Sequence, residues 1–321
     1  MRDAFPELRA ALSAHEPVPD STLATAIMLA SLEIISPNTF DVPISWQNHL
    51  QVARQIIISR GGLETLSSTG DGHLVFLSKW FAYLEVLGSL SGSKSTVEPI
   101  SGDFYASLGL EQDPSSSRVD CFLGVTTQCI SLLAQVAKLA HQCDAERVDA
   151  QCEIDPAWRP SSQVMEEAEK LRHALMDSMT TVHEACMHND PSQPTEEKSP
   201  QDIQEIQSCN AMYHWAGLIH LYRRVMGRLT ADADVQQCVQ SVVNELKKIS
   251  RGSTTEGCLL FPMFTAGCDA LDNDHRGALI ERLKGVEGWG MTHVLKARTL
   301  MQKVWETGKP WETLVAGEFF G

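Results

Sequence analysis

The nine cysteines of this 321-residue chain are spread so widely that no two of them form a closely spaced pair. Consecutive cysteines are at least eight residues apart, so the Cys-x-x-Cys pairs of zinc-binding clusters are absent from the sequence. The cysteines lie within apolar, helix-like segments, which is typical of reduced and buried thiols. We therefore expect an intracellular protein, nuclear or cytoplasmic, with no zinc cluster in this chain.

The chain also lacks a surplus of basic residues, a long apolar run and a signal peptide. Its 26 basic residues stand against 41 acidic residues, and a duplex phosphate backbone would repel a surface with this net charge of −15. No stretch of about 18 uninterrupted apolar residues marks a membrane span. The charges of Arg2, Asp3 and Glu7 are unlike a secretory signal. We expect neither nucleic acid nor membrane as a direct partner.

Motifs that announce a chemistry are missing as well. The sequence contains no Gly-x-Ser-x-Gly nucleophile elbow, no phosphate-binding loop, no Gly-x-Gly-x-x-Gly fingerprint after a strand and no His-Glu-x-x-His pair. No nucleophile is recognisably matched with a base. We therefore predict no catalytic residue, no cofactor and no metal site.

Strand-like alternation never extends beyond four residues, whereas helical periodicity runs along most of the chain. From Phe122 to Leu139, apolar residues recur every three or four positions, which predicts a central buried helix. With 43% hydrophobic residues the chain can bury a large core. The prediction is an all-α fold of about ten helices in a single domain over residues 1–321.

Capping residues, prolines and glycines set the predicted helix ends. Asp20 and Ser21 are good N-caps, Pro37 ends the first helix, and Gly61 with Gly62 ends the second. Residues 189–201 contain three prolines and little apolar surface, so they are predicted to form a flexible linker. The later helices are predicted over residues 73–90, 122–139, 162–187, 202–229, 235–249, 259–268, 274–283, 291–305 and 311–319.

Blocks of sequence near both ends of the chain occur in a recognisable order. The first is Trp46-Gln-Asn-His-Leu50, followed by Arg60-Gly-Gly62. The second is Leu-Leu-Phe-Pro-Met-Phe-Thr-Ala-Gly-Cys from Leu259 to Cys268. Further residues of the pattern are His275, Arg276, Trp305 and Trp311.

This set resembles the fungal-specific regulatory domain that follows Zn₂Cys₆ DNA-binding clusters in fungal transcription factors. The resemblance extends over roughly residues 20–320. It implies an all-α regulatory domain that senses an effector or binds a partner protein. One departure stands out, because full-length members begin with a six-cysteine cluster that this chain does not contain. We expect either an excised regulatory piece or a natural protein without its DNA-reading module.

The resemblance implies a ligand site among the helices, since sterol-sensing relatives hold an apolar effector there. Phe261, Met263, Phe264 and Cys268 are the candidates, because aromatic and methionine side chains make adaptable apolar contacts. The alternative is that these residues are ordinary core. The expected partners are a small apolar effector and either a co-regulator protein or a second copy of the chain.

Trp46 and His49 share one face of a predicted helix and complete the candidate ligand-binding set. In that role His49 would donate or accept a hydrogen bond from an effector or a partner helix. The alternative is a structural histidine satisfied within the core.

A different class of function is an enzyme on the same helical fold. Asn273, Asp274 and Glu281, with Gly277, match the frame of the Mg²⁺-binding motif of class I terpene cyclases. A cyclase needs an opposing carboxylate run, and Asp144, Glu146 and Asp149 lie upstream without forming Asp-Asp-x-x-Asp. The alternative is that Asp274 caps a helix and Arg276 is structural.

A third option is a dimerisation module without a ligand. The cavities of the folded protein distinguish these three functions. Carboxylates at the mouth of an apolar cavity favour the enzyme, an apolar cavity without them favours the sensor, and the absence of a cavity favours the dimerisation module.

Overall fold

The computed structural model confirms the all-α prediction, with eleven α-helices among the residues that it describes. These residues are 18–36, 45–68, 70–92, 118–120, 122–149, 151, 153–181, 184–185, 199–288, 290–315 and 317–321. The predicted linker falls mostly outside this set, since only residues 199–201 of it are described.

The described part of the chain consists of helices and a few shorter elements. Their bounds are α2 Asp20–Ile35, α3 Trp46–Ser59, α4 Leu63–Ser68, α5 Gly72–Ser91, α7 Thr127–Arg147, α8 Ser162–Thr180, α9 Pro200–His220, α10 Ala233–Leu246, α11 Leu260–Asp269, α12 Asn273–Glu287 and α13 Thr292–Thr307. Shorter elements are the π-helix η2 Leu221–Val225 and the 3₁₀ turns η3 Thr254–Cys258 and η4 Trp311–Thr313. Two strands of two residues, β1 Arg118–Val119 and β2 Glu184–Ala185, pair in parallel.

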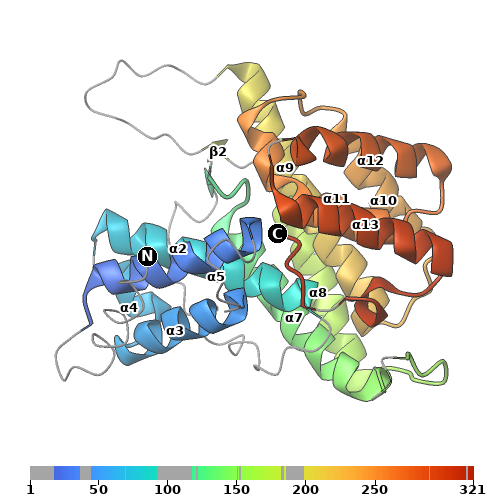
Figure 1. Cartoon of the computed structure of the whole chain (residues 1–321). Helices are drawn as coiled ribbons and strands as arrows, with labels where there is room; N and C mark the ends of the chain where they lie inside the picture. The colour runs from blue at the N-terminus through green and yellow to red at the C-terminus, as the bar shows by residue number, and fades with distance from the viewer. Residues whose placement is uncertain are drawn as a thin grey trace.

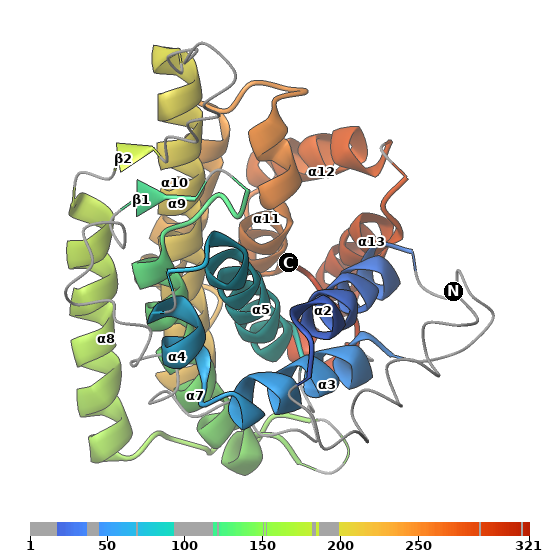
Figure 2. The same ribbon diagram turned by 90° about the vertical axis from the view of Figure 1, so that its left-hand side faces the viewer.

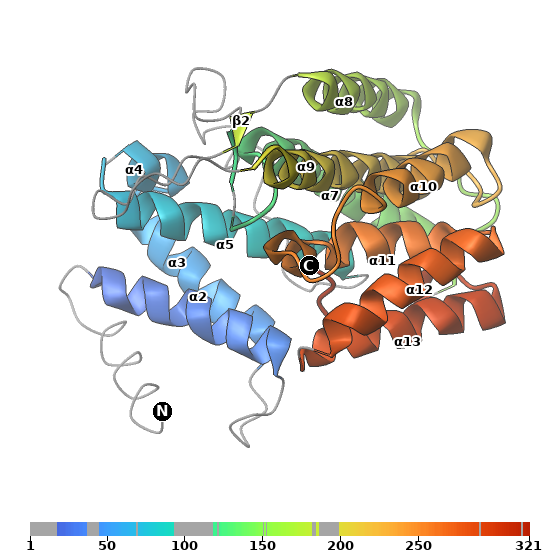
Figure 3. The same cartoon turned by 90° about the horizontal axis from the view of Figure 1, so that it is seen from above.

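The helices form two groups that the long helix α7 joins (Figure 1). Helices α2 to α5 lie on one side and α9 to α13 on the other, while α7 packs against both α5 and α9. Helix α8 covers the outer side of α7 and α9 (Figure 2). The C-terminal segment, residues 309–315 and 317–321, enters the space between the two groups (Figure 3). It is therefore placed to contact both.

Buried apolar residues form one connected cluster that runs from Leu23 to Phe320. Helix α5 lies within it. It is long and apolar enough to cross a membrane, with a mean hydropathy of 1.2. However, 72% of its most apolar stretch is buried inside the protein. The core helix of a water-soluble protein has the same composition.

Several helix ends follow local signals in the sequence. The prediction that Asp20 and Ser21 cap the first helix was wrong, because both lie in the first turn of α2 and the residue at the cap position is Pro19. Thr126 caps α7 by accepting a hydrogen bond from the backbone N–H of Cys129, and Asp272 caps α12 in the same way. Gly61 and Gly62 follow α3 with φ values of 92° and 94°, which confirms the predicted stop.

Several predicted boundaries were wrong. The linker does not extend to residue 201, because Ser199 and Asp202 form a capping box and Pro200 begins α9. Helix α9 does not continue to residue 229 but passes into the π-helix η2, which ends at Val225. Helix α8 ends at Thr180 instead of residue 187. The predicted helix over residues 311–319 is only the single turn η4, and the described residues beyond it form no helix.

Candidate functional site

Three of the predicted ligand contacts lie in the interior of the protein. The exposed fractions of Phe261, Met263 and Phe264 are 1%, 0% and 2%. Phe264 stacks on Phe320 with ring centroids 4.0 Å apart, and Phe261 stacks on His220 at 5.6 Å. None of the three lines either cavity described below.

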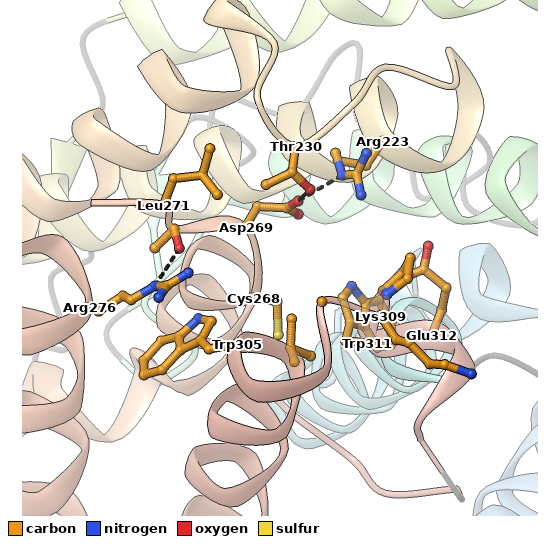
Figure 4. Close-up of a pocket in the computed structure, with 14 residues that line it drawn as sticks. Arg223, Thr230, Cys268, Asp269, Leu271, Arg276, Trp305, Lys309, Trp311 and Glu312 are labelled. Atoms are coloured by element: carbon orange, nitrogen blue, oxygen red, sulfur yellow. Dashed lines mark hydrogen bonds and ion pairs between the residues drawn. The ribbon is translucent and has the colours of Figure 1, made fainter. Parts of the chain in front are cut away.

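A cavity of about 180 Å³ opens where α11, α12, α13 and the C-terminal segment meet; we call it the cleft (Figure 4). Cys268, the fourth predicted residue of the helix-11 set, lines it. The full lining is Arg223, Thr230, Cys268, Asp269, Ala270, Leu271, Arg276, Val304, Trp305, Gly308, Lys309, Pro310, Trp311 and Glu312. The walls are therefore both aromatic and charged, which differs from the purely apolar site that the sequence predicts.

Asp269 forms one wall of the cleft and is held from two sides. Its Oδ1 atom lies 2.7 Å from Nε of Arg223 and accepts a hydrogen bond from the Thr230 hydroxyl at 2.8 Å. Burial raises the pKa of Asp269, and the Arg223 guanidinium opposes that shift. The Gln236 amide donates to the backbone carbonyl of Asp269 at 2.8 Å. The carboxylate is thereby fixed and its charge compensated.

Arg276 and Trp305 form the opposite wall (Figure 4). The guanidinium of Arg276 lies 4.9 Å from the centroid of the Trp305 ring, and its Nε donates to the carbonyl of Ala270 at 2.8 Å. The indole N–H of Trp305 donates to the carbonyl of Gly267 at 2.8 Å. A Cβ atom on Gly267 would lie 2.1 Å from Cε of Met301, so glycine allows α11 and α13 to approach closely.

Beneath the C-terminal segment lies a cluster of buried charges, Asp144, Arg147, Arg224 and Glu312, which we call the ion cluster. Arg224 Nη2 lies 2.6 Å from Asp144 Oδ2, and Arg147 Nη2 lies 2.7 Å from Asp144 Oδ1. Arg147 also reaches Glu312 in the C-terminal segment at 2.9 Å. Since Glu312 also lines the cleft, cleft and cluster share a residue.

The π-helix η2 directs two neighbouring arginines, one to the cleft and one to the ion cluster. Arg223 pairs with Asp269 at the cleft, while Arg224 pairs with Asp144 in the ion cluster. Arg224 also donates to the carbonyl of Leu90 at the end of α5, at 2.9 Å, and lies over the Trp311 ring. Single π-turns within α-helices are often found at functional sites. Sequence reasoning missed both arginines because helical spacing alone does not reveal a π-turn.

A second cavity, also of about 180 Å³, lies between α2, α3, α13 and the end of the chain. Trp46 lines it and donates its indole N–H to the carbonyl of Gly317 at 3.2 Å. His293 lines it too, and burial lowers the pKa of this histidine to about 4. His49 is buried, and burial lowers its pKa, but it does not line the cavity. The structure thus separates the predicted pair.

The residues of the cyclase alternative lie on the solvent side of α12. Asn273, Asp274 and Glu281 are exposed, and Glu281 pairs with Lys284 at 3.1 Å. The helix is capped by Asp272 instead of Asp274. Upstream, Asp144 is occupied by two arginines. Among the described residues, no group of three or more His, Cys, Asp or Glu side chains could hold a metal ion.

Comparison with protein families gives one match. The model of the fungal specific transcription factor domain matches residues 1–314, and the chain belongs to this family. No curated protein and no solved structure matches the chain. Membership supports a regulatory role in a transcription factor.

Proposed function

We propose that this chain is an effector-sensing regulatory domain that works in the nucleus as part of a transcription factor, with the cleft as its sensor. The observation that carries the proposal is the position of the C-terminal segment. Its residues Lys309 to Glu312 line the cleft, and Glu312 binds Arg147 of the ion cluster. A ligand in the cleft would therefore touch the segment that joins the two helix groups.

The mechanism is a shift between helix arrangements, because a ligand favours whichever arrangement it binds more tightly. Three contacts of the C-terminal segment would respond to such a shift. Trp311 packs edge-on against His220 at 5.9 Å, Phe320 stacks on Phe264, and the backbone N–H of Phe320 donates to the Ser91 hydroxyl at 3.1 Å. These contacts reach α9, α11 and α5, so a change at the cleft would extend to both helix groups.

The chemistry of the cleft calls for an effector with both polar and apolar parts. Arg223, Arg276 and Lys309 offer charge, while Trp305 and Val304 offer apolar surface. This differs from the apolar effector that the sequence predicts, because Phe261, Met263 and Phe264, three of the residues expected to bind it, lie in the core. Contact with a co-regulator or a second copy of the chain remains a prediction from the sequence, as does the absence of direct DNA binding.

A tethered reporter tests this function. We expect the chain, fused to an unrelated DNA-binding module in a fungal cell, to change reporter expression in a way that depends on growth conditions. Arg276→Gln should abolish that dependence at unchanged protein abundance, because it removes a cleft charge. Arg251→Gln is the matched control, since Arg251 is exposed and does not line the cleft. Expression equal to that of the module alone under every condition would contradict the proposal.

A further inference from the structure

The acidic groups of the cleft are already compensated by the protein. Asp269 receives Arg223 and Thr230, and Glu312 receives Arg147. Both side chains are almost fully buried, with exposed fractions of 7% and 4%. A buried carboxylate with this many charge-assisted donors has little capacity left to attract a cation.

Several N–H donors of the basic residues in the cleft, in contrast, are not used by the protein. Arg276 donates a hydrogen bond only from Nε, to the carbonyl of Ala270. Its two terminal nitrogens have no hydrogen-bond or ion-pair partner among the described residues. Arg223 uses Nε on Asp269 and Nη1 on the carbonyl of Arg228, so its Nη2 is uncommitted within the described part of the chain. Lys309 pairs with Glu153, but both side chains are about half exposed, and such pairs contribute little. The cleft therefore holds a surplus of positively charged donors.

The surrounding surface limits the size and shape of what these donors could bind. Trp305 holds the Arg276 guanidinium over its ring, so the arginine is positioned before a ligand arrives. Val304 and Leu271 add apolar surface beside it. At about 180 Å³ the cavity is smaller than a drug-sized site of about 300–1,000 Å³. Only a compact molecule fits.

We propose that the cleft binds a compact organic carboxylate whose carboxylate pairs with Arg276 and whose flat or short apolar part lies against Trp305 and Val304. This inference rests on the proposed function and names the class of its effector. A planar guanidinium with two open N–H groups matches a carboxylate in a bidentate manner. The net charge of −15 repels anions at long range, so recognition depends on contacts inside the cleft, within the screening length of about 8 Å.

Isothermal titration of the purified full chain with benzoate and succinate tests the inference, with benzamide and benzylamine as neutral and cationic counterparts. We expect both carboxylates to bind and the amide and amine to bind at least about tenfold more weakly, a difference of about 1.4 kcal/mol. Arg276→Gln should weaken carboxylate binding about tenfold, and Arg276→Lys less, because charge is kept and bidentate geometry is lost. Arg251→Gln should bind like the wild type.

Different outcomes would contradict the class of ligand, the role of Arg276 or the proposed function. If neither carboxylate binds at millimolar concentration, or if benzamide binds as tightly as benzoate, the class of ligand is wrong. If Arg276→Gln does not fold, Arg276→Lys replaces it, because this variant keeps the positive charge beside Trp305 and loses the bidentate geometry. Carboxylate binding as tight as that of the wild type by the folded variant would overturn the assignment to Arg276. A reporter that still responds to growth conditions when no carboxylate binds would overturn only the ligand class. Carboxylate binding with a silent reporter would overturn only the proposed function.

Discussion

Replacing Asp144 with alanine is expected to lower the free energy of unfolding by about 3–5 kcal/mol. Asp144 is the carboxylate that the ion cluster places against both Arg147 and Arg224, and the exposed fraction of the Arg224 side chain is only 3%. Without Asp144, Arg224 keeps hydrogen bonds to the Leu90 carbonyl and the His220 ring but no carboxylate partner among the described residues. A buried charge left without its counter-charge is strongly destabilising.

Equilibrium unfolding in urea, followed by circular dichroism, measures this effect. Glu166→Ala is the matched control, because Glu166 also pairs with a basic residue, Lys170, but on the solvent side of α8. We expect no measurable change for it, since exposed pairs contribute little. An Asp144→Ala protein as stable as Glu166→Ala would show that the ion cluster does not hold the two helix groups together.

Phe264→Ala is expected to cost about 3–5 kcal/mol of unfolding free energy, the usual loss for a phenylalanine in a protein core. The ring is 2% exposed and packs on Phe320 at 4.0 Å and on Trp311 at 5.5 Å. Its loss therefore removes core packing and also the apolar anchor of the C-terminal segment.

Denaturation curves of the ligand-free protein provide the measurement, with Leu229→Ala as the control. Leu229 is 76% exposed, so its removal should change the unfolding free energy by about 0.5 kcal/mol or less. A cost below about 1.5 kcal/mol for Phe264→Ala would mean that the ring packs on few protein atoms, as a ring facing a ligand would.

Helix content and several helix ends could be read from the sequence because their causes are local. Periodic apolar residues predicted a buried helix over residues 122–139, but the observed helix is Thr127–Arg147, and Phe122 lies outside it and is 54% exposed. Gly61 with Gly62 predicted the end of α3. Local signals failed where a tertiary contact decides the backbone. The π-helix η2 directs Arg223 and Arg224 to partners on other elements. In the C-terminal segment Trp311 and Phe319 have helical spacing, but both are buried without a continuous helix between them.

Only some residues of the candidate site could be predicted from the sequence. Cys268 and Trp46, both singled out from the motifs, line cavities, but two different ones. Arg276, which belongs to the recognised pattern, forms a wall of the cleft. Glu312 could not be found in advance, because its partner Arg147 lies 165 residues away in the chain. Contacts at such separation are set by the packed fold and leave no spacing in the sequence.

The central claim is that the C-terminal segment links the cleft to both helix groups through the ion cluster. Hydrogen exchange of backbone amides in wild type and Glu312→Gln tests it most directly, since the substitution keeps the shape and removes the charge that Arg147 binds. We expect faster exchange in η4, at Phe320, whose amide donates to Ser91, and in the last turn of α5. Faster exchange confined to residues 311–313, with Phe320 and α5 unchanged, would contradict the claim.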